Sequence, residues 1–325
     1  MLKEQLFKIS SESEFERTAL EIFQFQYERN LVYKKYCDLL NIEKENIQRI
    51  EEIPFLPIQF FKTYRILSSS KKPEKIFTSS GTTGIQTSKH HIADLSLYEK
   101  SFTQGFEEIY GPVKEYVVLA LLPSYLEREG SSLIYMVNDF IEKSNFRESG
   151  FYLNNLSELA KTLKKLDSEE KKIILFGVSF ALLDLVEKFR FNLKNTIIVE
   201  TGGMKGRRKE LIRKELHEIL QNGFGVEKIH SEYGMTELLS QAYSTGEGIF
   251  TCSDTLKVLI RDPEDPFKIL PNGKTGGINI IDLANLYSCS FLATQDLGKK
   301  MGENKFEILG RFDNSDLRGC NLLLL

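Results

Sequence analysis

The most chemically suggestive part of this 325-residue sequence is residues 77–84, where hydroxyl-bearing and glycine residues follow one another with almost no side-chain bulk. Such a loop can turn backbone N–H groups and hydroxyls onto a polyphosphate, because no larger side chain blocks the approach. Taken alone, a cluster of this kind is more often a plain surface turn. The candidate phosphate ligands are Thr78, Ser79, Ser80, Gly81, Thr82, Thr83 and Gly84.

Four further groups follow in order: the pair Gly202 and Gly203, Tyr-Gly-Met-Thr-Glu at residues 233–237, Asp296, and Gly-Arg-Phe-Asp at residues 310–313. Each has an ordinary structural interpretation. Residues 233–237 could form a strand-to-helix turn with a capping threonine, and Asp296 could be a surface charge. Their order behind the first loop favours a shared function.

Together these residues resemble the adenylate-forming superfamily of ligases, and within it the acyl-protein synthetases of the LuxE type. The resemblance rests mainly on residues 78–84 and 233–237 and extends to the C-terminus. It implies an enzyme that uses ATP and Mg²⁺ to join a carboxylic acid, such as a fatty acid, to the α-phosphate of ATP with release of pyrophosphate.

The resemblance also implies which residues contact the nucleotide base and the leaving group. Residues 78–84 would hold the departing phosphates, which is one of the tasks of phosphoryl chemistry. Gly202 and Gly203 would line the adenine pocket, and Tyr233 would stack near the adenine, with Gly234 in the same turn.

Further residues would act at the α-phosphate and the ribose. By resemblance, Thr236 would bond the α-phosphate and Glu237 would help to hold Mg²⁺ as a hard oxygen ligand. Asp296 would accept both ribose hydroxyls, and Arg311 would contact ribose or phosphate. Related enzymes usually have a Pro-Lys pair directly after the phosphate loop, so Lys89 is a candidate catalytic residue in a shifted register.

The sequence departs from most adenylate-forming enzymes at its end. By resemblance, those enzymes continue past the Gly-Arg-x-Asp segment into a mobile domain with a catalytic lysine, whereas this sequence ends at Leu325. LuxE-type enzymes share the shorter form. Lys89, Lys205 or a partner chain could then stabilise the transition state.

Cys320 follows the last nucleotide-contacting segment. LuxE-like proteins move the acyl group from AMP to a cysteine near the C-terminus, which would make Cys320 a catalytic nucleophile, with Arg318 lowering its pKa. A small buried residue is the alternative. Cys37, Cys252 and Cys289 have no Cys-x-x-Cys spacing and are expected in the core.

Three functions remain open. The first is acyl-protein synthesis, with the acyl thioester delivered to a protein partner of the acyl-CoA-reductase type. The second is a stand-alone adenylating ligase that delivers to CoA or a carrier protein. The third is a non-catalytic nucleotide-binding subunit of a reductase complex.

Composition excludes several other classes. The net charge of −3 gives no global basic field for nucleic acid. No apolar run approaches the roughly 20 residues that a membrane-spanning helix needs. The N-terminus has no apolar signal core, so we expect a cytoplasmic protein.

The elements that must position these residues indicate an α/β fold with mostly parallel sheets and flanking helices. Strand-like runs at residues 116–122, 172–176, 196–199 and 227–230 alternate with helical stretches at 131–143, 156–166, 181–189 and 207–220. Shorter strand-like runs after residue 246 predict a small antiparallel part. We expect a helical N-terminal part (1–75), a nucleotide-binding core (76–245) and a β-rich subdomain (246–325).

Overall fold

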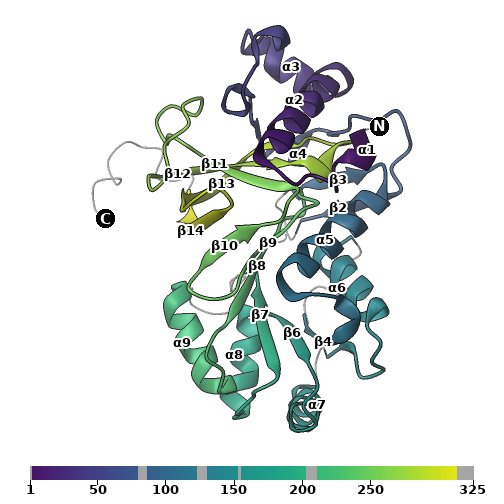
Figure 1. The fold of residues 1–325 in the computed structure, drawn as a ribbon, viewed down its shortest axis with the longest axis vertical. Helices are drawn as coiled ribbons and strands as arrows, with labels where there is room; N and C mark the ends of the chain where they lie inside the picture. The colour runs from purple at the N-terminus through teal and green to yellow at the C-terminus, as the bar shows by residue number, and fades with distance from the viewer. Residues whose placement is uncertain (1, 80–85, 123–129, 153–154, 203–210, 313–325) are drawn as a thin grey trace.

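The computed structural model describes residues 2–79, 86–122, 130–152, 155–202 and 211–312 of the chain. Within these ranges, twelve strands form one continuous sheet in which a parallel half joins an antiparallel half, and two more strands form a separate hairpin. Helices lie on both sides of the parallel half, with α8 and α9 on one side and α5 and α6 on the other (Figure 1).

The parallel half consists of β4 (Val117–Leu121), β5 (Gly150–Phe151), β6 (Ile173–Val178), β7 (Thr196–Thr201) and β8 (His230–Tyr233), in the order β5-β4-β6-β7-β8. β4 and β6 are buried along their whole length, as is typical of parallel strands covered on both faces. The helices that connect and cover these strands are α5 (Leu95–Tyr110), α6 (Ser132–Lys143), α7 (Leu156–Ser168), α8 (Ser179–Lys188) and α9 (Arg213–Phe224), with the short η3 (Val113–Glu115).

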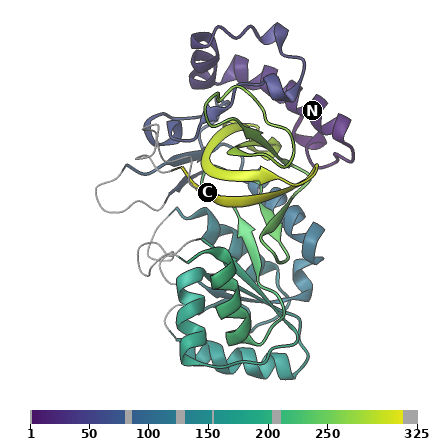
Figure 2. The ribbon, with the colours of Figure 1, turned by 90° about the vertical axis from the view of Figure 1, so that its left-hand side faces the viewer.

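The antiparallel half continues from β8 in the order β9-β10-β14-β13-β12-β11. Its elements are β9 (Ala242–Ser244), β10 (Ile249–Cys252), β11 (Leu256–Arg261), β12 (Thr275–Asp282), η4 (Leu283–Asn285), β13 (Phe291–Lys300) and β14 (Lys305–Arg311). Figure 2 shows these yellow and green strands next to the N-terminal helices, with the parallel half at the opposite end.

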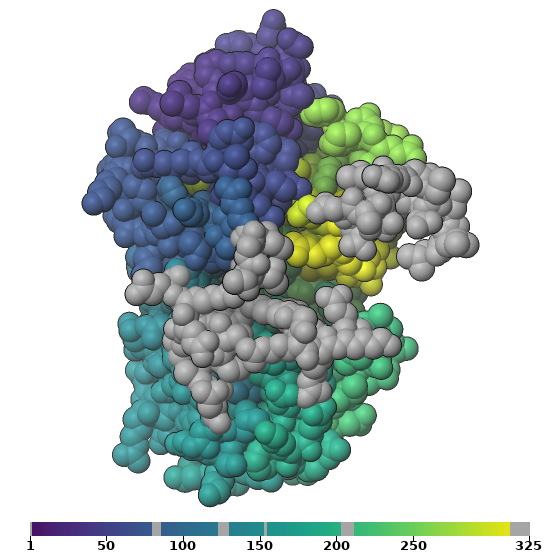
Figure 3. Space-filling model, turned by 180° about the vertical axis from the view of Figure 1, so that it is seen from behind, coloured from purple at the N-terminus to yellow at the C-terminus, as the bar shows by residue number. Residues whose placement is uncertain are grey.

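The N-terminal part packs on the antiparallel half. It contains α1 (Leu2–Gln5), α2 (Glu12–Arg29), α3 (Leu31–Leu39), η1 (Lys44–Asn46), η2 (Ile50–Glu52), β1 (Leu56–Pro57) and α4 (Phe60–Thr63). Phe23 of α2 lies edge-on to Phe291 of β13. Gln26, one turn further along α2, donates to the carbonyls of Asn285 and Leu286. In Figure 3 the purple-to-blue and green-to-yellow surfaces adjoin at one end of the molecule.

The predicted fold class is confirmed, but several bounds differ. β8 begins at His230, where the predicted strand ended, so residues 231–233 belong to the strand rather than following it. α9 begins at Arg213 within the described residues. The hairpin strand β3 (Lys89–Ile92), which pairs with β2 (Lys75–Thr78), and helix α5 had no counterpart in the predicted elements.

The three cysteines expected in the core are buried there: Cys37, Cys252 and Cys289. Cys320 lies outside the described residues. None of the described helices is both long and apolar enough to cross a bilayer.

Candidate active site

The predicted phosphate loop connects the two strands of the β2–β3 hairpin. Thr78 ends β2 opposite Lys89 of β3. Beyond them, Ser79 N donates to the Ser88 carbonyl at 3.1 Å, and Ser88 N donates to Ser79 Oγ at 2.9 Å. This pair closes the base of the loop. The predicted ligands Ser80, Gly81, Thr82, Thr83 and Gly84 lie outside the described residues.

Residues 234–240 leave β8 as a turn, and the capping-threonine interpretation with a following helix is wrong. Asp282, at the end of β12, holds this turn. One of its oxygens accepts from Leu239 N at 2.7 Å and Ser240 N at 3.2 Å, and the other accepts from Ser240 Oγ at 2.6 Å. Because Asp282 is fully buried, these donors replace the water that the carboxyl group loses.

His90 and Asn285 hold the carbonyls of the two residues expected to act at the α-phosphate. His90 Nδ1 lies 2.8 Å from the carbonyl oxygen of Thr236, and His90 Nε2 lies 3.0 Å from Asn285 Oδ1. Asn285 Nδ2 donates to the Glu237 carbonyl at 2.8 Å. Burial lowers the pKa of His90 to about 4, so the ring is neutral near pH 7 and carries one N–H. This proton lies on Nδ1 because the Thr236 carbonyl can only accept, and Nε2 then has no proton to donate to Asn285 Oδ1.

The side chain of Glu237 lies beside the base of the hairpin. Glu237 is 7% exposed, and burial raises the pKa of its carboxyl group, while the Ser88 hydroxyl, Lys62 and Arg311 act in the opposite direction. Mg²⁺ in nucleotide enzymes is often held by one or two carboxylates together with substrate phosphates. A single buried carboxylate fits a metal ion that arrives with the nucleotide, because the phosphates would supply further ligands.

The described residues contain no ready-made metal centre. Among them, no group of three or more histidine, cysteine, aspartate or glutamate side chains is arranged to hold an ion. Any Mg²⁺ at Glu237 would therefore need phosphate oxygens as further ligands.

Asp296, Tyr233 and Arg311 form a second polar group. Asp296 and Arg311 are directly opposite each other on β13 and β14, and Arg311 Nε lies 3.2 Å from Asp296 Oδ1. Tyr233 Oη donates to Asp296 Oδ2 at 2.8 Å. Each carboxylate oxygen keeps one lone pair, so Asp296 can still accept from a vicinal diol.

The ring of Tyr233 is buried beside the rings of Phe250 and Phe306. Burial, followed by the charge of Asp296, raises the pKa of Tyr233 well above its usual value, so the hydroxyl stays protonated and donates. The Tyr233 hydroxyl therefore positions Asp296, independently of any contact between its ring and the adenine base.

At the carboxyl ends of β7 and β8 lie two acids on opposite faces of the sheet, a buried Glu200 and a partly buried Glu232. Glu200 accepts from the hydroxyls of Ser179 at 3.0 Å and Ser231 at 2.9 Å. Glu232 accepts from Thr201 Oγ1 at 2.5 Å. Burial and then the nearby Glu200 raise the pKa of Glu232 to about 7.

The two predicted glycines near these strand ends have steric reasons to be glycine. Gly202 follows β7 with a φ of 72°, and its carbonyl oxygen lies 2.5 Å from Ser179 Oγ. A Cβ on Gly234 would lie 2.2 Å from Glu232 Oε1, so the Glu232 side chain would have to move to admit it. Gly203 lies outside the described residues.

Most described residues of the predicted site fall into two neighbouring groups. Thr236 and Glu237 lie beside the base of the β2–β3 hairpin. Tyr233, at the end of β8, lies with Asp296 of β13 and Arg311 of β14. Lys89 is exposed on β3, where it lines a hollow of about 440 Å³. Four residues that hold the turn and the hairpin were not predicted from the sequence: His90, Asp282, Asn285 and Ser88. Polar residues directly after an apolar strand, as at Asp282 and Asn285, were the available signal.

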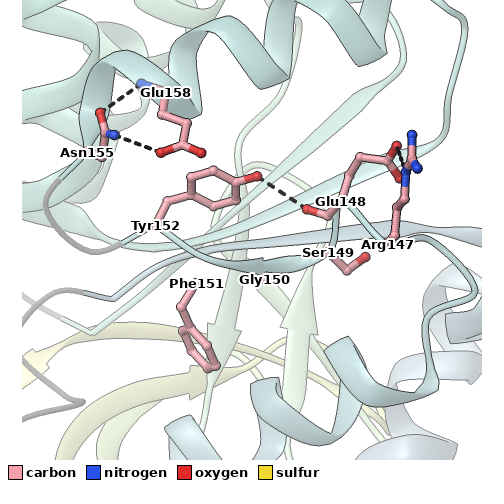
Figure 4. A pocket seen from close by; sticks show the side chains of 8 residues that line it. All are labelled: Arg147, Glu148, Ser149, Gly150, Phe151, Tyr152, Asn155 and Glu158. Atoms are coloured by element: carbon pink, nitrogen blue, oxygen red, sulfur yellow. Dashed lines mark hydrogen bonds and ion pairs between the residues drawn. The ribbon is translucent and has the colours of Figure 1, made fainter.

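A larger hollow of about 610 Å³ lies far from these groups, at the outer strand β5 (Figure 4). Its charged side chains are paired: Arg147 Nε lies 3.4 Å from Glu148 Oε1, and Asn155 Nδ2 donates to Glu158 at 2.7 Å. Tyr152 Oη donates to the Glu148 carbonyl. None of the predicted site residues lines it, so size does not identify the site here.

Comparison with known proteins gives a consistent result. A family model described as acyl-protein synthetase, LuxE, matches residues 3–325. Two relatives are long-chain-fatty-acid–luciferin-component ligases. The Aliivibrio fischeri protein is 23% identical, with 99% of this chain and 91% of the relative covered. The Vibrio harveyi protein is 24% identical, with 92% and 84% covered.

A solved structure shares the fold. It is an open conformation of 2-hydroxyisobutyryl-CoA ligase in complex with 2-HIB-AMP and CoA. The TM-score is 0.70 at 13% identity, and the match covers 93% of this chain and 71% of that chain. At this identity the likeness shows the fold alone.

Proposed function

Because the chain belongs to the LuxE acyl-protein synthetase family, we propose that it activates a fatty acid with ATP and transfers the acyl group to a protein thiol. In the first step a carboxylate oxygen of the acid bonds to the α-phosphorus. The bond from that phosphorus to the bridging oxygen breaks, and pyrophosphate leaves with the electron pair. In the second step a thiolate bonds to the acyl carbon and AMP leaves.

The main support for the proposal is that the two groups of polar residues lie next to each other at one end of β8. Tyr233 and Arg311 orient Asp296 for the ribose hydroxyls. Three to four residues further along the chain, Thr236 and Glu237 have their carbonyls fixed by His90 and Asn285. Rigid placement of the ribose and the α-phosphate favours in-line attack, since orientation accounts for much of the barrier in such reactions.

Charge at the phosphates must be neutralised as the leaving group departs. Thr236 would donate its hydroxyl to an α-phosphate oxygen, and Glu237 would help to hold Mg²⁺. That ion, when bound, would lower the charge on the leaving phosphates. Lys62 and Arg311, whose charges act on Glu237, would add to this neutralisation.

The fatty-acid assignment and the thiol acceptor come from the family. The two relatives are named as ligases of long-chain fatty acids, so acids of this class head the list of substrates to test. Cys320 is the proposed acceptor thiol, and an acyl-CoA-reductase-type protein is the proposed destination of the thioester.

Pyrophosphate–ATP exchange, measured across carboxylic acids of increasing chain length with Mg²⁺ present, tests the first step. Exchange that depends on one class of acid supports adenylation. Binding of ATP without exchange for any acid, with or without a partner reductase, contradicts it and favours a non-catalytic nucleotide-binding subunit.

Acyl transfer is tested with radiolabelled acid and Cys320→Ala. We expect the variant to keep exchange and to lose the acid-stable, hydroxylamine-labile label on the protein. Labelling of Cys320→Ala equal to the original chain would contradict Cys320 as acceptor. Consumption of free CoA would instead favour a stand-alone ligase, a reaction for which a solved structure of the same fold holds CoA.

A further inference from the structure

The face of β8 that turns away from Asp296 carries a carboxyl group that the proposed mechanism does not use. Side chains alternate along a strand, so Glu232 points to the opposite face of the sheet from Tyr233. Glu232 Oε2 accepts from Thr201 Oγ1 at 2.5 Å. Glu232 Oε1 lies against the backbone of Gly234, where a Cβ would be 2.2 Å away. The carboxyl group is therefore held at the strand end, directly before the tyrosine that positions Asp296.

Tyr243 of β9 lies directly opposite Glu232 in the ladder and therefore on the same face. Its side chain is 1% exposed, yet among the described residues its hydroxyl has no hydrogen-bond partner. Burial, and then the charge of Glu232, raise the pKa of Tyr243 well above its usual value, so the hydroxyl keeps its proton. Gln241 Oε1, two residues earlier in the chain, is also buried without a partner in the described structure. Buried polar atoms are nearly always bonded, so these two require a partner from outside the chain, either water or a ligand.

The side chains around these polar atoms are mostly aromatic. Phe106 and Tyr110 belong to α5, which packs on β9 (Figure 1), and their ring centroids lie 6.3 and 5.5 Å from that of Tyr243. Tyr98, also on α5, is buried, and the charge of Glu232 adds to the effect of burial in raising its pKa. A few polar atoms within a mainly apolar surrounding are typical of a site for a small organic molecule.

The polar atoms restrict the kind of group that could bind among them. A hydroxyl can donate to the Glu232 carboxylate and accept from Tyr243 Oη at the same time. An ammonium group can only donate, which would leave the Tyr243 O–H without an acceptor. A plain hydrocarbon chain would satisfy neither residue, and an unsatisfied buried polar group is unfavourable. The arrangement therefore favours a hydroxyl group.

We propose that Glu232 and Tyr243 recognise a hydroxyl group on the carboxylic acid, so that the preferred substrate is a hydroxylated fatty acid. This assignment rests on the proposed adenylation at the same strand end. Glu232 lies four residues before Thr236 in the chain, which would act at the α-phosphate, so the hydroxyl would be near the carboxylate, on its second or third carbon. The ribose would occupy the Tyr233 face of the strand end, and the acid would occupy the Glu232 face.

Titration of the full chain with acids of equal chain length tests this assignment without requiring turnover. The four acids are the unsubstituted, the 2-hydroxy, the 3-hydroxy and the 3-amino compound. We expect one of the hydroxy acids to bind at least about tenfold more tightly than the unsubstituted acid, because a site that bonds a substrate hydroxyl discriminates against the analogue without it. Equal affinity for the hydroxylated and unsubstituted acids, including no binding of either, overturns the assignment. A preference for the amino acid also overturns it.

Tyr243→Phe isolates the role of the hydroxyl, because this atom bonds to no described residue and the ring is kept. We expect the variant to melt at the same temperature as the original chain, with its preference for the hydroxy acid reduced to within about twofold. Tyr36→Phe on α3 is the matched control. Its hydroxyl donates to the Phe55 carbonyl in the N-terminal part, so this variant should keep the full preference.

Two variants of Glu232 test the carboxyl group. Glu232→Gln, which can still accept a hydrogen bond, should keep part of the preference for the hydroxy acid. Glu232→Leu should reverse the preference, because an apolar side chain favours the unsubstituted chain. An unchanged preference in Tyr243→Phe overturns the assignment even if Glu232→Leu does not fold.

Because titration measures binding alone, the two proposals fail separately. A chain that prefers the hydroxy acid through Glu232 and Tyr243, but shows no pyrophosphate–ATP exchange with it, contradicts adenylation and leaves the recognition of the hydroxyl in place. A chain that shows exchange equally well with the unsubstituted acid keeps adenylation and loses the recognition of the hydroxyl.

Discussion

Two sets of polar residues flank residues 234–240, and they differ in what they bind. The first set, which we call the holding set, is Asp282, Asn285 and His90. These side chains are buried and bond to backbone groups of the turn. The second, which we call the charged set, is Lys62, Arg65, Lys89 and Arg311, whose side chains reach solvent.

The two sets are therefore expected to contribute to different properties, the holding set to stability and the charged set to ligand binding. A buried acceptor that is removed leaves its donors unsatisfied, which costs about 1–3 kcal/mol for each group. An exposed cation contributes at most about 1 kcal/mol to folding, but it can contribute strongly to the binding of a polyanion. Replacing the holding set should therefore destabilise the protein, and replacing the charged set should mainly weaken ligand binding.

Asp282→Ala should give the largest effect. Three donors lose their partner in a fully buried place, so we expect the free energy of unfolding to fall by about 3 kcal/mol. Urea denaturation measures this change. The exposed Asp254→Ala is the control and should stay within about 0.5 kcal/mol. A decrease in unfolding free energy for Asp282→Ala as small as that of the control would contradict the stabilising role of the holding set.

Asp296→Ala should lower kcat/KM for ATP by about a hundredfold, because a ribose clamp and the orientation of Arg311 are both lost. Stability should change less than for Asp282→Ala, since only the Tyr233 hydroxyl loses a buried partner. Steady-state exchange kinetics and a thermal melt measure the two quantities. An unchanged KM for ATP would contradict ribose binding by Asp296.

His90→Ala should reduce the unfolding free energy by about 2 kcal/mol, because the Thr236 carbonyl loses its buried donor. As a positioning residue, His90 should affect kcat more than KM for ATP. His90→Gln, which can still donate to the Thr236 carbonyl, should recover part of both. Equal kinetic defects in the two variants would argue against positioning.

Glu232→Gln tests how the stability of the protein depends on pH. Burial raises the pKa of Glu232 to about 7 in the folded protein, above its ordinary value, so the folded state holds this proton more tightly than the unfolded state. Stability from this group is present at low pH and is lost as pH rises through about 7. Urea denaturation at pH 5 and pH 8 should show the original chain losing about 1–2 kcal/mol relative to the variant.

The smallest effect is expected at the hollow on β5. Arg147→Ala removes a side chain that is almost fully exposed and pairs with its own neighbour Glu148, so stability should change by less than about 0.5 kcal/mol. Exchange activity and pyrophosphate affinity should not change. A loss of activity there would show that this larger hollow takes part in function.

Much of the site could be predicted because its residues lie in short, contiguous segments. Residues 78–79 and 233–237 were found as local patterns, and strand–helix alternation predicted the parallel half of the sheet. Asp296 and Arg311 were found from their order, and the structure pairs them across β13 and β14.

The holding set could not be predicted, because its contacts join residues far apart in sequence. His90 and Thr236 are 146 positions apart, and Asn285 and Glu237 are 48 apart.

β3 was missed because Lys-His-His-Ile lacks the β-branched character of a strand. In α5, Gly105 weakens the helical pattern, yet a Cβ there would meet Ser253 at 3.0 Å, so close packing explains the glycine.

The bonds of Gln26 bear on the order in which the chain can fold. Gln26 contacts Asn285, Leu286 and Ser290, which lie about 260 residues later. Helix α2 leaves the ribosome early, but its binding surface on the antiparallel strands is made last. At typical synthesis rates of about 5–20 residues per second, α2 must wait many seconds with its apolar face uncovered. Packing of α2 on the antiparallel strands is therefore expected to be a slow folding step, as is typical of such distant contacts.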